Sequence, residues 1–109
     1  MKTKRQIGRL FEEYVCQLLR ETFNDSTIRP TRNSGGSTEL EDINCKQLIC
    51  QLKVKLTTEN INILYKDWKK LINAIPVKSI RLPIFWYRNK NNENFAMLKA
   101  EDFCRLIKE

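Results

Sequence analysis

Residues 41–55 read EDINCKQLICQLKVK, and this stretch predicts two neighbouring strands. Residues 41–45 and 48–55 favour extended structure, and Lys46-Gln47 between them fits a tight turn. The second segment alternates strictly between an apolar face and a polar face: Cys50, Leu52 and Val54 against Gln51, Lys53 and Lys55. The stretch therefore predicts a hairpin whose polar face lies in the middle of a sheet.

The hairpin would bring an acidic side chain beside that polar face. If the two strands pair, Asp42 reaches the side of the sheet that carries Gln51 and Lys53. Asp42 offers an anionic oxygen, Gln51 an amide oxygen and Leu52 a backbone carbonyl, and Mg²⁺ prefers such oxygens. Lys53 would orient or deprotonate the attacking water, or neutralise charge on a phosphate. The alternative interpretation is a solvated strand face, which is the common case for a lone pair of polar residues.

Around the hairpin, the pattern predicts one domain with the element order α-β-β-β-α-β-β-α. Apolar residues at helical spacing predict helices at 4–23, 58–75 and 101–108. Further strands are expected at 27–32, after Pro83, and at 94–99, with a flexible loop at 33–40. We therefore expect an α/β fold with a mixed central sheet flanked by helices. Trp68, Trp86 and Tyr87 are expected in the core.

Composition narrows the possible chemistry. The 109 residues include no histidine, and the four cysteines lack CxxC spacing, so a zinc site and Ser-His or Cys-His nucleophiles are not expected. Three of the cysteines lie among apolar residues, which is typical of reduced thiols in a cytoplasmic, intracellular protein. No apolar run is long enough to span a membrane, and no secretory signal is seen. We expect no membrane association.

The charge is concentrated in a way that favours a polyanionic partner. The net charge is +7, and residues 46–90 carry ten Lys and Arg against two acids. Residues 12–42, by contrast, carry seven acids against three arginines, which fits a polyanion binder that gathers carboxylates for a cation. The candidates for phosphate contacts are Arg5, Arg9, Arg32, Lys55, Lys66, Lys69, Lys70 and Arg88. The alternative is a basic surface that is simply solvated.

The first helix offers a second carboxylate. Glu12 lies nearer the edge of the apolar stripe than Glu13, and it follows Gly8 by four residues, so no side chain blocks it. The alternative is two solvated helix glutamates. A resemblance favours the first interpretation: four segments, in order, resemble the PD-(D/E)XK nucleases and are most similar to the archaeal-type Holliday junction resolvases. The segments are IGRLFEEYVCQLL, RNSGGSTELED, CQLKVK and LPIFWYRNKNNENFAMLKAEDFCRLI.

The resemblance covers nearly the whole chain and gives roles to particular residues. It implies a small restriction-endonuclease-like fold, with Glu12, Asp42, Gln51 and Lys53 as catalytic residues. It implies metal ligation by Asp42, Gln51, the Leu52 carbonyl and Glu12, and substrate contacts by Arg32 and Ser34. The family hydrolyses DNA phosphodiesters with Mg²⁺ or Mn²⁺, usually as a homodimer that makes paired nicks across a four-way junction. The expected partners are thus branched DNA and a second copy of the chain.

Two positions depart from the family pattern. Glu41 replaces the proline of the PD pair, and Gln51 replaces the glutamate of the E-x-K strand. An amide oxygen is a neutral ligand, so the metal affinity should fall. Gln51 is either an active variant, an engineered inactivation or a decayed site. Two other functions therefore stay open: a sequence-specific nuclease of the homing or restriction type, and a non-catalytic nucleic-acid-binding module.

Overall fold

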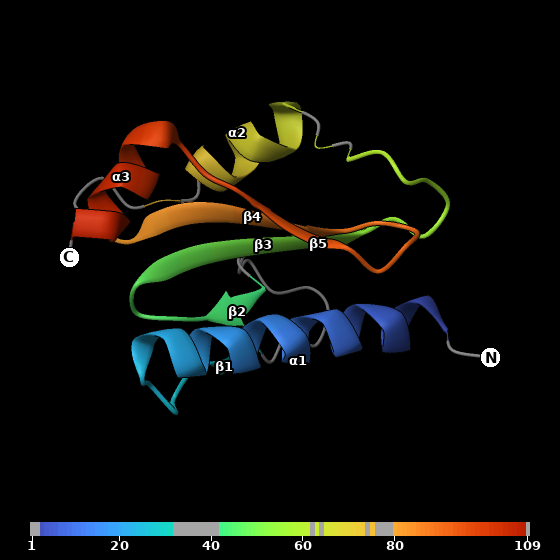
Figure 1. Cartoon of the computed structure of the whole chain (residues 1–109), viewed down its shortest axis with the longest axis horizontal. Coiled ribbons are helices and arrows are strands. Elements are labelled where there is room, and N and C mark those ends of the chain that lie inside the picture. The colour runs from blue at the N-terminus through green and yellow to red at the C-terminus, as the bar shows by residue number, and fades with distance from the viewer. Residues whose placement is uncertain are drawn as a thin grey trace.

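Five strands form one mixed sheet, and their spatial order follows their order in the chain (Figure 1). The computed structural model describes residues 3–31, 42–61, 63, 65–73, 75 and 80–108. The strands are β1 (Arg29–Pro30), β2 (Ile43–Asn44), β3 (Leu48–Val54), β4 (Leu82–Arg88) and β5 (Asn94–Met97). Neighbouring strands are antiparallel, except that β3 and β4 run parallel. The expectation of an α/β chain with a mixed sheet flanked by helices is confirmed.

Helix α1 (Lys4–Phe23) has the bounds that its apolar spacing predicts, because both ends carry local stop signals. At the N-terminus, the Thr3 hydroxyl accepts the Gln6 N–H and the Gln6 side chain accepts the Thr3 N–H, which forms a capping box. At the C-terminus, Asn24 adopts the left-handed conformation with φ 51° and ends the helix. The helix is therefore specified locally at both ends.

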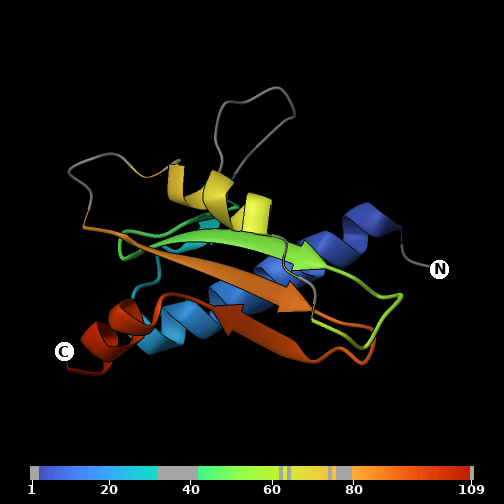
Figure 2. The ribbon, with the colours of Figure 1, turned by 90° about the horizontal axis from the view of Figure 1, so that it is seen from above.

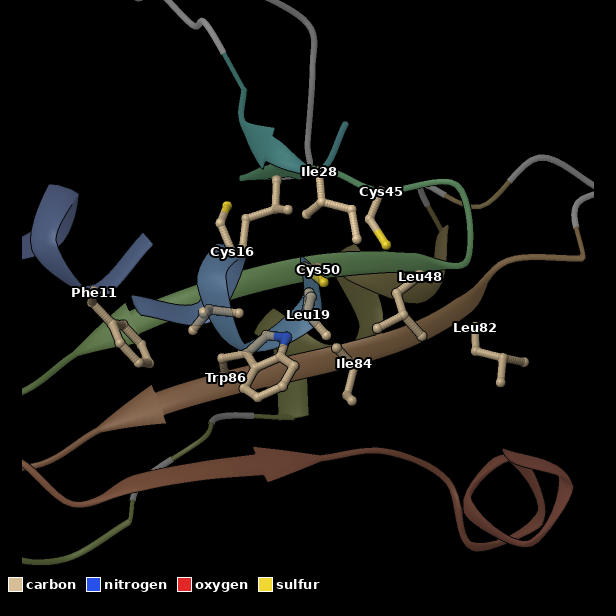
Figure 3. Packing of buried hydrophobic residues seen from close by; sticks show 12 residues of the cluster. Phe11, Cys16, Leu19, Ile28, Cys45, Leu48, Cys50, Leu82, Ile84 and Trp86 are labelled. Carbon is tan, nitrogen blue, oxygen red and sulfur yellow. The ribbon is translucent and has the colours of Figure 1, made fainter. Parts of the chain in front are cut away.

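The two faces of the sheet are covered by different helices (Figures 1 and 2). Helix α1 packs on the face that carries Cys50 and Trp86, where the larger cluster of buried side chains lies (Figure 3). Helix α2 (Tyr65–Asn73) packs on the opposite face, where Leu71 meets Ile49 and Phe85. Trp86 and Tyr87 are buried and Trp68 packs against the second cluster, as expected for core residues.

Helix α2 is shorter than predicted, and the helix expected to begin at residue 58 begins at Tyr65. The preceding segment instead bonds to the hairpin that joins β4 and β5. The Thr58 carbonyl accepts the Lys90 N–H at 2.9 Å, and the Glu59 carbonyl accepts from the Asn89 side chain at 2.9 Å. These long-range hydrogen bonds use carbonyls that a helix would need, so the local apolar spacing is overridden.

The remaining elements are close to their predicted positions. Helix α3 (Ala100–Lys108) follows β5, and its Leu106 packs against the α1 cluster. None of the four cysteines, all within the described residues, forms a disulfide; three are buried and Cys104 is exposed, which agrees with reduced thiols. None of the helices within the described residues has the length and apolar character needed to cross a bilayer. The predicted loop at 33–40 lies outside the residues that the structure describes.

Candidate active site beside Asp42

The predicted hairpin forms and brings Asp42 to the polar end of β3. The Asp42 N–H donates to the Cys50 carbonyl at 2.9 Å, one step beyond the pairing of Ile43 with Cys50. The Asp42 carboxylate then turns along β3, and its Oδ2 accepts the Leu52 N–H at 2.8 Å. The same oxygen accepts from Gln51 Nε2 at 3.1 Å. Asp42 and Gln51 therefore meet as the sequence predicts.

The Leu52 carbonyl faces the same edge as this carboxylate. In a β-strand, the N–H and the C=O of one residue point toward the same neighbouring strand. The Leu52 N–H meets Asp42 beyond the last residue pair of β2 and β3, so the Leu52 carbonyl also points to this edge. The Asp42 carboxylate, the Gln51 amide and the Leu52 carbonyl thus lie together where β2 ends beside β3.

The carboxyl groups of Asp42 and Glu12 both have raised pKa values. Burial raises the pKa of Asp42, and the hydrogen bond from the Leu52 N–H offsets part of that rise. Burial also raises the pKa of Glu12 on α1, and the nearby charge of Asp42 raises it further, while Arg9 opposes the rise. Both carboxyl groups are therefore harder to ionise than usual, Asp42 through burial and Glu12 through burial and the charge of Asp42, and a bound cation would relieve both.

Lys53 has a partner that the sequence did not predict. Its Nζ lies 3.5 Å from Asp67 Oδ2 on α2, and the side chains of Lys53 and Asp67 are 30% and 25% exposed. These residues line a hollow of about 420 Å³ together with Asp42, Gln51, Leu52, Lys70 and Phe85. Lys53 therefore points into the same hollow as Asp42, and Asp67 adds a second acidic group there.

Sequence reasoning missed Asp67 because its role depends on how α2 crosses β3. On a helical wheel Asp67 is simply one polar residue among lysines, and only packing of α2 on the polar face of β3 brings it to Lys53. One available signal was that Asp67 is the single acid in the helix sequence YKDWKKLIN. A single acid among three lysines and one asparagine is a candidate partner for a lysine on the strand beneath.

The predicted phosphate contacts that the structure describes fall into three groups. Lys70 lines the hollow, so it lies beside the candidate site. Arg88 packs over the rings of Phe11 and Tyr14, at 4.8 and 5.2 Å from their centroids, and Lys69 lies over Tyr65. The remaining described candidates are exposed: Arg5, Arg9, Lys55 and Lys66. Arg32 and Ser34 lie outside the described residues.

The donor set at this edge fits a hard divalent cation. Asp42, the Leu52 carbonyl and Gln51 Oε1 are all oxygen donors, which Mg²⁺ and Mn²⁺ prefer. An ionised carboxylate only accepts hydrogen bonds, so the Gln51 amide presents its NH₂ to Asp42 in this structure, and ligation would require the amide to turn over. Among the described residues, no three Cys, Asp or Glu side chains are grouped closely enough to hold a metal. Any ion here therefore depends on Gln51 and the backbone.

Helix α1 leaves open space at Gly8, one turn before Glu12. A Cβ added at Gly8, one turn earlier, would meet no atom within 4 Å. Gly8 is therefore not required by packing within the described structure.

Comparison with known proteins adds no independent support for a family. The chain matches no protein-family model, no curated protein and no solved structure. The resemblance to the PD-(D/E)XK nucleases stays a prediction, and the function must be argued from the site.

Proposed function

We propose that this chain is a metal-dependent, structure-selective DNA endonuclease that resolves four-way junctions by paired nicks as a homodimer. The observation that carries the proposal is the meeting of Asp42 with Gln51 and Leu52 at the edge of β3. Lys53 lines the same hollow as Asp42, and Glu12 lies close enough for the Asp42 charge to raise the pKa of Glu12. A net charge of +7 supports a polyanionic substrate.

In this proposal each residue has a separate task. Asp42, the Gln51 amide oxygen and the Leu52 carbonyl would hold Mg²⁺ or Mn²⁺, and Glu12 would add negative charge from the α1 side. Such an ion, when bound, polarises a phosphoryl oxygen and makes a bound water more acidic. The Lys53 ammonium neutralises charge that develops on the phosphate, or orients the attacking water. Asp67 holds the Lys53 ammonium in the hollow.

The test is cleavage of a labelled synthetic four-way junction, with Mg²⁺, Mn²⁺ or EDTA, beside a linear duplex of the same arm sequence. We expect metal-dependent paired nicks in the junction alone. Asp42→Asn and Lys53→Ala should abolish cleavage while junction affinity stays within about three-fold, because phosphate contacts elsewhere supply most of the affinity. Lys90→Ala, which removes an exposed lysine from the β4–β5 turn, is the matched control.

Several results would contradict the proposal. Retained cleavage in either Asp42→Asn or Lys53→Ala would contradict the assignment of the catalytic site. Equal cleavage of the linear duplex would point to a sequence-specific nuclease. Light scattering at micromolar concentration tests the homodimer separately, since a monomer cannot easily place paired nicks.

One observation favours a second candidate, a non-catalytic nucleic-acid-binding module. Gln51 Nε2 already donates to Asp42, so the amide stabilises the carboxylate without a metal. In such a module the wild-type chain binds junctions but does not cut them in either metal. Gln51→Glu then separates the possibilities: restored cleavage identifies a site that lost its activity at this position, whereas continued inactivity supports a binding module.

A further inference from the structure

A second hollow lies near the start of β3, at the other end of the strand from Lys53. It has a volume of about 590 Å³, and three of its six lining residues are cations. Arg29 comes from β1, Lys46 from the turn between β2 and β3, and Arg81 from the residue before β4. The fold therefore collects three positive charges from distant parts of the chain at one place.

The cation at the base of this hollow is fixed in position. Arg81 Nη2 donates to the Leu48 carbonyl at 2.9 Å, so its guanidinium is anchored to the first residue of β3. Its charge also reaches Cys45, where it opposes the rise that burial causes in the pKa of the thiol. A guanidinium held this way loses little additional freedom when it binds an anion, whereas Arg29 and Lys46 line the same hollow with exposed side chains.

Asp25, an acid that interacts with Lys46, already accepts hydrogen bonds from its own loop. Asp25 accepts hydrogen bonds from the Thr27 N–H and hydroxyl, and these bonds are the main reason that its pKa is lowered. It also interacts with Lys46, though this effect on its pKa is the smallest of those acting. No acid lines the hollow itself within the described residues. The cluster therefore has a net positive charge with a polar hydroxyl and amide, from Thr27 and Asn44, beside it.

The separation from the candidate active site suits a nucleic-acid backbone. Leu48 and Lys53 are five residues apart on β3, so the two ends are about 17 Å apart at roughly 3.3 Å per residue. One DNA strand places a phosphate about every 3.4 Å along the helix axis, so about five nucleotides would span the two positions. The distance is large enough for two distinct phosphate contacts and short enough for one duplex arm.

We propose that Arg29, Lys46 and Arg81 form a phosphate-binding site that contacts the nucleic-acid backbone about five nucleotides from a phosphate beside Lys53. The identification of the ligand as nucleic acid rests on the proposed function, but the site itself needs neither metal nor cleavage. It positions the substrate and carries no sequence information, because its contacts are to phosphate alone.

The test is junction and duplex binding by fluorescence anisotropy in EDTA, between 50 and 300 mM salt. The variant is Arg29→Gln combined with Lys46→Gln, because both side chains are exposed, while Arg81 is kept for its bond to Leu48. We expect about ten-fold weaker binding and a salt dependence reduced by about two phosphate contacts. Lys90→Gln combined with Lys99→Gln, near β5 at the opposite edge of the sheet, is the charge-matched control and should leave the salt dependence unchanged.

The outcomes separate this site from the catalytic proposal. An unchanged salt dependence in the Arg29 and Lys46 double variant, or an equal change in the control, overturns the site even if the protein cuts junctions. The expected change in a protein that never cuts supports the site and contradicts the endonuclease. Titration with inorganic pyrophosphate, followed by amide NMR shifts, distinguishes the source of the phosphate: saturable tight binding of pyrophosphate, with no binding of DNA, overturns the backbone assignment.

Discussion

The two halves of β3 have opposite environments, although they belong to one strand. The first three residues, Leu48, Ile49 and Cys50, are buried on both faces of the sheet. The last four, from Gln51 to Val54, are only partly buried. The first half lies between the α1 cluster and the α2 cluster, whereas the second half extends beyond β2 and borders the hollow. The first half of β3 therefore contributes to stability, whereas the second half carries the candidate catalytic residues.

The largest expected effect tests the stability of the buried half. Leu48→Ala should lower the free energy of unfolding by about 3 kcal/mol, since it removes buried methyl groups and leaves a cavity in the α1 cluster. Lys53→Ala, five residues later, should change it by less than about 1 kcal/mol, because Lys53 makes one partly exposed ion pair. Urea unfolding followed by circular dichroism measures both. Equal losses would remove the distinction between the two halves.

A smaller effect is expected from Asp42, which lies at the boundary of the two halves. Because burial raises its pKa, the folded chain binds more protons than the unfolded chain between the unfolded and the folded pKa. The contribution of Asp42 to stability therefore rises as the pH falls through that window and is lost as the pH rises. Asp42→Asn removes this effect, and it should raise the melting temperature at pH 7 by about 2–5 °C.

Thermal unfolding between pH 3 and pH 7 checks this expectation. The difference between wild type and Asp42→Asn should shrink toward pH 3, where Asp42 is protonated in both states. Glu13→Gln replaces an exposed acid on α1 and should leave the pH response as it is. An Asp42→Asn curve parallel to the wild-type curve would show that Asp42 does not titrate abnormally.

The smallest effect on stability is expected in the hollow beside the second half. Asp67→Asn removes the partner of Lys53, and the free energy of unfolding should change by no more than about 0.5 kcal/mol because the pair is partly solvated. Junction affinity should instead increase about two- to five-fold, since a negative charge leaves a hollow that also contains Lys70. Anisotropy titration in EDTA measures the gain. Weaker binding would mean that holding Lys53 in place matters more for affinity than the negative charge of Asp67.

The same contrast explains what the sequence could and could not predict. The bounds of α1 were predictable because its apolar spacing and the caps at Thr3 and Asn24 are local signals. The meeting of Asp42 with Gln51 was predictable because a short turn fixes the register of the hairpin. The start of α2 was not, since Thr58 and Glu59 bond to a hairpin some thirty residues away in the chain. Asp67 and the Arg29, Lys46 and Arg81 cluster were missed for the same reason, as both depend on tertiary packing.

The agreement between strand order and chain order has a consequence for how the protein is made. During synthesis each strand emerges next to a neighbour that is already present, so no strand must be inserted between two others. The β2–β3 hairpin closes a very short loop, whereas the parallel pairing of β3 with β4 must wait for the crossover through α2. A nascent chain that ends before β4 would thus already contain both strands that position Asp42, Gln51 and Lys53. It would lack Phe85, which lines their hollow from β4.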